Sequence, residues 1–144
     1  MLKTVSNLGA GSGGTFPPAG ALSNVLVSNV TLNNTSAYFD GPTIAQGNVG
    51  TWFVIATVTL EDSTATFRAD AKLWDGTTII DSGCAPVIGT GGGYIGTITL
   101  AGVIVSPAGN LKISVKDSVT VTGLIDANKS GNAKDSSITA YRIG

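Results

Sequence analysis

The clearest pattern of hydrophobic and polar positions lies in residues 50–76. Within 52–60, one set of alternating positions is wholly apolar, and the other mixes Phe53 and Ile55 with threonines. Within 67–73, apolar side chains alternate strictly with charged ones. The first run suits a central strand that is covered on both sides. A second sheet is expected to cover one side, and a partner chain is one candidate for covering the other. The second run predicts a half-buried antiparallel strand that pairs with it.

Strand patterns continue to the end of the chain. Asp75-Gly76 predicts a two-residue hairpin turn, and Gly102 a bulge or bend inside a strand. Further strands are expected over 25–32, 37–39, 43–46, 77–80, 94–105, 111–115, 119–126 and 138–143. Turns recur every ~8 to 12 residues, and no stretch has the period of an amphipathic helix. The predicted fold class is all-β, an antiparallel β-sandwich or jelly roll of about 8 to 10 strands.

The first 21 residues differ from everything that follows. They are rich in glycine and proline and show no hydrophobic period. We therefore expect two parts, a flexible N-terminal arm over 1–21 and one sandwich domain over 22–144, with the arm ordering only against a partner. The arm residues expected to dock on that partner are Leu2, Val5, Leu8 and Phe16.

Charge is scarce. Only 12% of the residues are charged, against about 25% in an average protein, which favours a surface that is largely covered in an assembly. The net charge is −1 and the eight basic residues look scattered, so no nucleic-acid or membrane partner is predicted. The start of the chain has no signal-peptide pattern, which favours synthesis in a cytoplasm. Cys84, the single cysteine, excludes an intrachain disulfide and is expected to be a small buried side chain.

Catalytic constellations are missing from the sequence. The chain contains no histidine, which excludes serine and cysteine relays that depend on imidazole. Two G-x-G-x-x-G matches, at 9–14 and 91–96, are not followed by a helical pattern and do not predict a nucleotide site. No calcium loop appears, and we expect no enzyme activity, no cofactor and no metal. A glycan-cleaving enzyme stays open only if two carboxylates meet in a groove; most aspartates sit in turns, namely Asp40, Asp62, Asp75, Asp117 and Asp135.

The aromatic residues divide into core and surface candidates. Trp52, Phe53 and Phe67 are expected in the core. Trp74 continues the outward phase of a predicted strand, which suits either an interface anchor or a platform for stacking a sugar, and the low surface charge favours an interface. The residues predicted at this interface are Trp74, Tyr38 and Phe39.

Four segments of the chain resemble a domain found in structural proteins of tailed bacteriophages: 50–54, 71–78, 106–118 and 135–144. The arrangement is similar to the jelly roll of complement-like and TNF-like trimers and of the cement, or decoration, proteins of short-tailed phage capsids. The resemblance covers about residues 30–144 and leaves out the arm. It implies a virion structural protein made in the host cytoplasm, which binds the major capsid protein on the outer head surface, bridges its subunits and stabilises the shell. It also implies a homo-oligomer, with a trimer favoured and a dimer as the other option.

A second function stays open on the same fold. The chain could be the receptor- or glycan-binding tip domain of a phage tail or head fibre. A fibre tip is expected to follow a coiled-coil or triple-helical stalk, whereas residues 1–21 contain no such repeat. The sequence therefore favours the cement protein.

Overall fold

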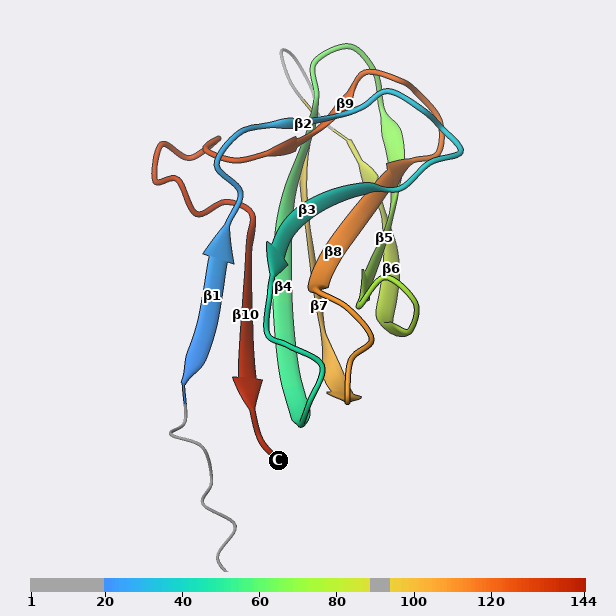
Figure 1. Ribbon diagram of the computed structural model, residues 1–144. Coiled ribbons are helices and arrows are strands. Elements are labelled where there is room, and N and C mark those ends of the chain that lie inside the picture. The colour runs from blue at the N-terminus through green and yellow to red at the C-terminus, as the bar shows by residue number, and fades with distance from the viewer. Residues whose placement is uncertain (1–19, 89–93) are drawn as a thin grey trace, which may run out of the picture.

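The computed structural model describes residues 20–88 and 94–144, and within them all regular structure is β-strand (Figure 1). No helix in these ranges is long and apolar enough to span a membrane. The ten strands are β1 (Ala21–Val25), β2 (Val30–Leu32), β3 (Phe39–Ile44), β4 (Thr51–Asp62), β5 (Phe67–Trp74), β6 (Ile79–Val87), β7 (Tyr94–Val105), β8 (Leu111–Asp117), β9 (Gly123–Asp126) and β10 (Ser137–Arg142).

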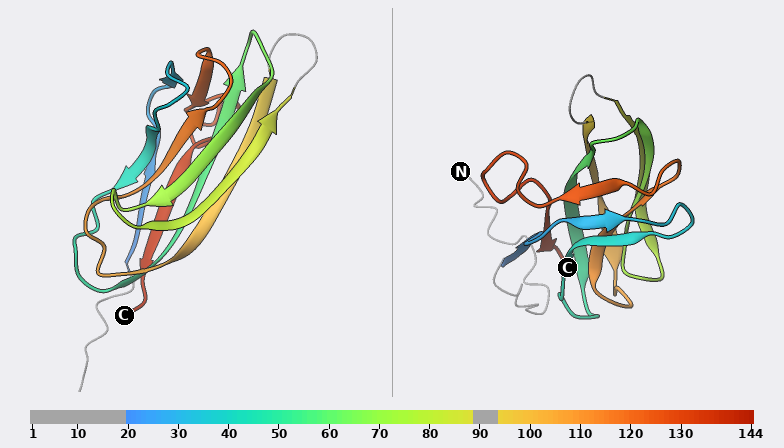
Figure 2. Two further views of the ribbon diagram at one scale, coloured as in Figure 1. Left: turned by 90° about the vertical axis from the view of Figure 1, so that its right-hand side faces the viewer. Right: turned by 90° about the horizontal axis from the view of Figure 1, so that it is seen from above.

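The strands form two antiparallel sheets that pack face to face (Figure 2). The first is here called the β4 sheet. In it, β7 pairs with one edge of β4, while β10 and β9 pair with successive parts of the other edge. β1 pairs with β10, and β2 pairs with β9. In the second, the β5 sheet, the order is β3-β8-β5-β6. The chain crosses from one sheet to the other after β2, β3, β4, β6, β7 and β8. These crossings give an antiparallel jelly roll, which confirms the predicted fold class.

The core lies between the two sheets, as the alternation along the strands requires. Every second residue of β4 from Trp52 to Leu60 is buried, and so is every second residue of β5 from Phe67 to Leu73. Burying one such large apolar side chain stabilises the fold by about 1.5 to 3 kcal/mol. Phe53 belongs to the other phase of β4 and is 37% exposed, so its prediction as a core residue is wrong.

The N-terminal part of the domain differs from the prediction. The expected strand over 25–32 is two strands, because Asn29 leaves the sheet edge and bonds instead to Asp126 and to the backbone of Ala127. The first strand already begins at Ala21, inside the predicted arm. Arm residues 1–19, including Leu2, Val5, Leu8 and Phe16, lie outside the described residues.

Two further predictions are corrected. The expected strands over 37–39 and 43–46 are one strand, because β3 runs through residues 40–42, and the register shift between Asp40 and Thr43 accommodates Pro42, which has no N–H to donate. Gly102 makes no bulge, since β4 and β7 stay in continuous register past it. A Cβ at Gly102 would lie 2.6 Å from Cγ2 of Ile80, so the glycine allows close packing of β6 on β7.

Candidate functional site

The outer side of the β4 sheet carries a group of exposed apolar residues, here called the apolar face: Phe53, Ile55, Ala101, Val103 and Tyr141. Antiparallel pairing brings them together, because Phe53 lies opposite both Val103 and Tyr141, and Ile55 lies opposite Ala101. The large members are 37 to 53% exposed. The next row is polar but uncharged, with the hydroxyls of Thr57 and Thr99 2.9 Å apart.

No charged side chain interrupts the apolar face. Between Thr51 and Thr57, every outward residue of β4 and each of its partners on β7 and β10 is apolar, serine or threonine. At the end of the face nearest Gly20, a hollow of about 500 Å³ opens between Phe53, Tyr141, Arg142 and Ile143. A face of this kind on a protein surface is typical of contact with another chain.

The outer side of the β5 sheet is different, because lysines and aromatic rings alternate on it. Lys72 Nζ lies 3.3 Å from the centroid of the Trp74 ring and 4.4 Å from that of the Tyr38 ring. Lys112 Nζ lies 5.0 Å from the Trp74 ring, and Lys116 Nζ lies 5.2 Å from the Tyr38 ring. The order Lys116, Tyr38, Lys72, Trp74, Lys112 is here called the lysine–aromatic ladder, and each step is a cation–π contact.

Hydrogen bonds fix one end of the ladder. Trp74 Nε1 donates to Ser114 Oγ at 2.7 Å, and Ser114 Oγ donates to Asp40 Oδ1 at 2.6 Å. Asp40 Oδ2 accepts from Lys112 Nζ, also at 2.6 Å. These residues come from β3, β5 and β8, so the indole is held by all three strands.

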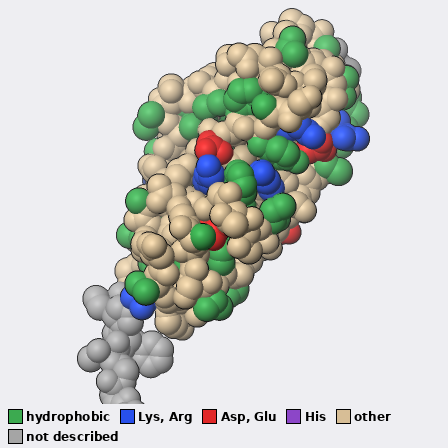
Figure 3. Space-filling model, turned by 45° about the vertical axis from the view of Figure 1, so that its right-hand side comes forward, with side chains coloured by type: hydrophobic (Ala, Val, Ile, Leu, Met, Phe, Trp, Pro, Cys, Tyr) green, Lys and Arg blue, Asp and Glu red, His purple; other side chains and the backbone are tan. Residues whose placement is uncertain are grey.

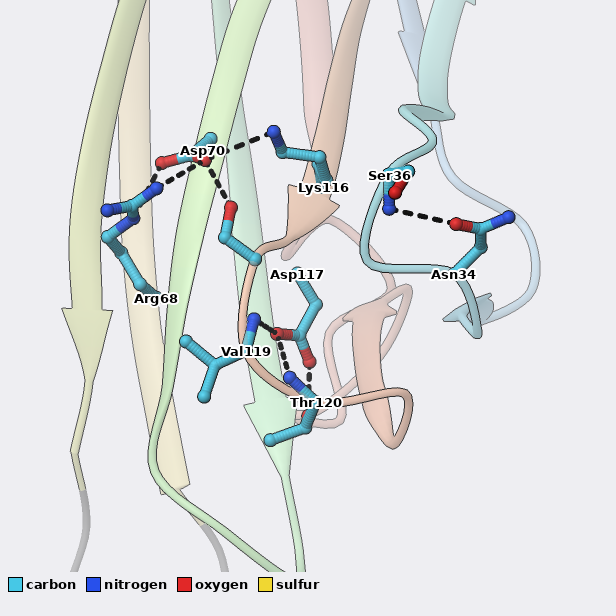
Figure 4. A network of polar contacts seen from close by, with 9 residues as sticks. Asn34, Ser36, Arg68, Asp70, Lys116, Asp117, Val119 and Thr120 are labelled. Carbon is cyan, nitrogen blue, oxygen red and sulfur yellow. Dashed lines mark hydrogen bonds and ion pairs between the residues drawn. The ribbon is translucent and has the colours of Figure 1, made fainter.

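Asp70 anchors the other end (Figure 4). Its carboxylate lies 3.1 Å from Arg68 Nε and 3.5 Å from Lys116 Nζ, and it accepts a hydrogen bond from the Ser118 hydroxyl. Burial alone would raise the pKa of Asp70, but the Ser118 hydroxyl and the two cations lower it below 3.8. Asp70 therefore stays ionised and neutralises part of the positive charge around it.

Lys72, at the centre of the ladder, has no such counter-ion. Among residues 20–88 and 94–144 no carboxylate oxygen lies within 4.0 Å of its Nζ, whereas both Lys112 and Lys116 have one. Partial burial lowers the pKa of Lys72 from 10.5, the charge of Asp40 opposes this shift, and the charge of Lys112 adds to it.

The basic residues are thus not scattered, and that prediction is wrong. Four of the eight, Arg68, Lys72, Lys112 and Lys116, point outward from the β5 sheet. Figure 3 shows basic side chains grouped with acidic and hydrophobic ones on one side of the molecule. With Asp40 and Asp70, this side carries four positive and two negative charges, a surplus of two, although the whole chain has a net charge of −1.

Two buried carboxylates meet at one end of the sandwich, but they form no open site. Asp62, at the end of β4, and Asp117, at the end of β8, both lie within hydrogen-bond reach of the Thr120 hydroxyl, which donates to Asp62. Asp62 also accepts from the backbone of Thr64 and Ala65, and Asp117 from the backbone N–H groups of the loop that follows it (Figure 4). Both side chains are fully buried. The pair therefore lacks the groove that a glycan-cleaving enzyme requires.

Other titratable groups of the described residues likewise form no metal site. The described ranges hold no group of three or more cysteine, aspartate or glutamate side chains placed to bind a metal ion. Cys84 is exposed, so its prediction as a buried residue is wrong. The reason is pairing: Cys84 lies opposite Asp70 and shares its outward direction.

Comparison with solved structures agrees with the fold. The Eiger TNF of S. frugiperda superposes with a TM-score of 0.57 over 89% of this chain and 94% of that chain, at 11% identity. The chain shares the jelly-roll fold of that structure. Two carbohydrate-binding modules align more loosely: the C-terminal CBM6 of LamC from Zobellia galactanivorans (TM-score 0.37, 10% identity, 85% of this chain and 100% of that chain) and CBM6cm-2 of Cellvibrio mixtus lichenase 5A (0.35, 8%, 83% and 100%).

No family model and no curated protein sequence matches the chain. The fold expected from the resemblance is confirmed, and at 11% identity the likeness is one of fold alone.

The structure brings two of the three predicted interface residues together. Trp74 and Tyr38 both contact Lys72, whereas Phe39 packs against the core. The sequence reasoning missed the lysines around them. Lys112 and Lys116 alternate with apolar residues, which gives their outward direction, but only the pairing of β5 with β8 shows that they flank Trp74 and Tyr38.

Proposed function

We propose that this chain is a virion structural protein, a capsid cement protein that forms a homo-oligomer and fastens major capsid subunits on the outer head surface. The observation that carries the proposal is the apolar face. An uncharged surface that exposes Phe53, Ile55, Val103 and Tyr141 on the central strands is suited to permanent contact with another chain. A second copy of the same chain is the simplest occupant, and a trimer is the favoured state.

The two sides of the sandwich then have separate tasks. The apolar face joins copies of the chain to one another, while the β5 sheet and the N-terminal arm remain available for the shell. The arm loses conformational entropy when it orders, and this cost is offset only where a formed surface buries its apolar residues, at about 25 cal/mol per Å². Binding therefore follows expansion of the capsid.

Sedimentation with capsids tests the proposal. The purified protein is mixed with expanded heads or with unexpanded procapsids of the phage that encodes it, and bound protein is quantified after pelleting. We expect saturable binding to expanded heads and weak binding to procapsids. Equal binding to both would contradict the proposed order of events.

The location of the protein in intact virions provides a second readout. Immunogold labelling should place the chain on heads, in agreement with sedimentation. Labelling confined to tails or fibre tips, with no binding to heads, would overturn the cement function and favour the receptor-binding tip.

A further inference from the structure

We propose that the lysine–aromatic ladder is a docking site for an acidic segment of a partner protein, in which Lys72 receives a carboxylate. The inference deepens the proposed function, since on that function the partner is the shell protein. It depends on the side-chain arrangement of the β5 sheet and not on the apolar face.

The first argument is charge. The outer side of the β5 sheet has a surplus of two positive charges on a chain whose net charge is −1, so the rest of the molecule is negative. Such an asymmetry orients an approaching acidic surface toward the ladder and accelerates encounter.

The second argument is the state of Lys72. Its ammonium group lies against two ring faces and has no carboxylate within 4.0 Å in the described ranges, and partial burial lowers its pKa. An aromatic face attracts a cation but accepts hydrogen bonds far more weakly than a carboxylate does. A partner carboxylate can therefore add to the existing contacts without displacing an ion pair. At Lys112 or Lys116 it would compete with Asp40 or Asp70.

The third argument concerns the class of partner. Lys72 covers one face of the Trp74 ring and contacts the Tyr38 ring, which removes ring surface that a sugar would need for stacking. Asp40 and Asp70 lie at the two ends of the ladder and repel a uniform polyanion such as nucleic acid. A protein segment with spaced carboxylates satisfies both conditions, because it places one charge at Lys72 and none at the ends.

A pair of matched variants tests the site. Lys72→Met keeps the length of the side chain and its packing but removes the charge, while Lys134→Met removes one charge from the exposed loop after β9. The probe is a synthetic peptide of alternating glutamate and serine, titrated into the oligomer at low ionic strength. Its binding is followed by the NMR cross-peak of the Trp74 indole N–H, which is held by Ser114.

We expect the peptide to shift the Trp74 cross-peak in the wild-type protein. Lys72→Met should weaken binding about five- to tenfold, Lys134→Met less than about twofold, and Lys72→Arg should restore most of the affinity. A thermal melt of each variant checks that the fold is retained.

Three outcomes would overturn the inference: no shift of the Trp74 cross-peak by the peptide, an equal loss for Lys72→Met and Lys134→Met, or tighter binding of a uronate oligosaccharide than of the peptide. The last would identify a glycan site instead. Failure of the wild-type protein to bind heads would remove the proposed function but not the peptide result, so the two failures are distinguishable.

Discussion

Asp126 is the residue whose charge is least compatible with its surroundings. It is almost fully buried on β9 beside Glu61, its Oδ1 accepts a hydrogen bond from Asn29 at 2.9 Å, and its Oδ2 has no partner in the described ranges. Burial and the Glu61 carboxylate raise the pKa of Asp126 from 3.8 to about 6. Lys129 binds Glu61 and lowers the pKa of Glu61, so the proton of this pair resides on Asp126.

This pair predicts a stability that falls as the pH rises. The pKa of Asp126 is higher in the folded state than in the unfolded one. The stability that the protonated Asp126 contributes is therefore fully present below about pH 3.8 and is lost as the pH rises through about 6. Asp126→Asn keeps the acceptor for Asn29 and removes the charge. We expect it to raise the free energy of unfolding at pH 8 by about 1 to 2 kcal/mol, with little effect at pH 4.5. Urea melts at both pH values measure this.

The matched control for Asp126→Asn is Asp135→Asn, since Asp135 is accessible and its pKa is lowered by hydrogen bonds from Ser130. That change should not stabilise the protein at pH 8. An unchanged or lower stability of Asp126→Asn at pH 8 would show that Asp126 is tolerated as an anion.

At the scale of elements, the Thr120 hydroxyl ties the two sheets together at one end. Asp62 terminates β4 in one sheet and Asp117 terminates β8 in the other, and Thr120 donates to the first while lying within hydrogen-bond reach of the second. Burial would raise the pKa of Asp62, but hydrogen bonds from Thr64, Thr122 and Ala65 lower it to about 2. The stability that these bonds supply is therefore present above about pH 3.8 and is lost as the pH falls through about 2.

Thr120→Val tests this connection, because it keeps the shape of the side chain and removes the hydroxyl. We expect a loss of about 1 to 3 kcal/mol in the free energy of unfolding at neutral pH, since buried carboxylates lose a donor. Thr120→Ser, which keeps the hydroxyl, should lose less than half as much. Equal losses for the two variants in chemical denaturation would show that the hydroxyl contributes no more to stability than the methyl group does, and would contradict the proposed connection.

The apolar face is also a property of elements, since it exists only where β7, β4 and β10 lie side by side. Ile55→Glu places a charge in its centre at a position that is already 39% exposed. If the face joins copies of the chain, this variant should sediment as a folded monomer, because burying an unpaired carboxylate in an interface is costly. The mass is measured by analytical ultracentrifugation.

Val27→Glu is the control for Ile55→Glu, because Val27 is 89% exposed and lies outside the apolar face. It should leave the mass of the oligomer unchanged. A wild-type protein that is monomeric at all concentrations, or an Ile55→Glu protein of unchanged mass, would refute self-association through this face.

For the whole molecule, the apolar face lies on the outer side of one sheet and the charged ladder on the outer side of the other, with the core between them. The sequence was sufficient for the fold class and for the buried residues of β4 and β5, because strand alternation reports burial directly. It was insufficient to predict that Phe53 and Cys84 are exposed, or which residues make up the ladder. Their environment depends on which strands pair, and residues such as Trp74 and Lys112 are far apart in the chain but adjacent across β5 and β8.

Truncation tests the division between domain and arm. A chain without residues 1–19 keeps all ten strands, so its melting temperature should stay within about 3 °C of that of the full chain. If the arm docks on the shell, sedimentation with heads should fall at least about tenfold. Unchanged occupancy would mean that the arm is only a tether.

The exposed Cys84 is a convenient site for attaching a fluorescent label. It is the single thiol of the chain and lies directly opposite Asp70, beside the ladder. A maleimide dye attached there reports on the β5 sheet of every protomer without any engineered substitution. Quenching of such a dye on mixing with heads would reveal which side of the molecule faces the capsid.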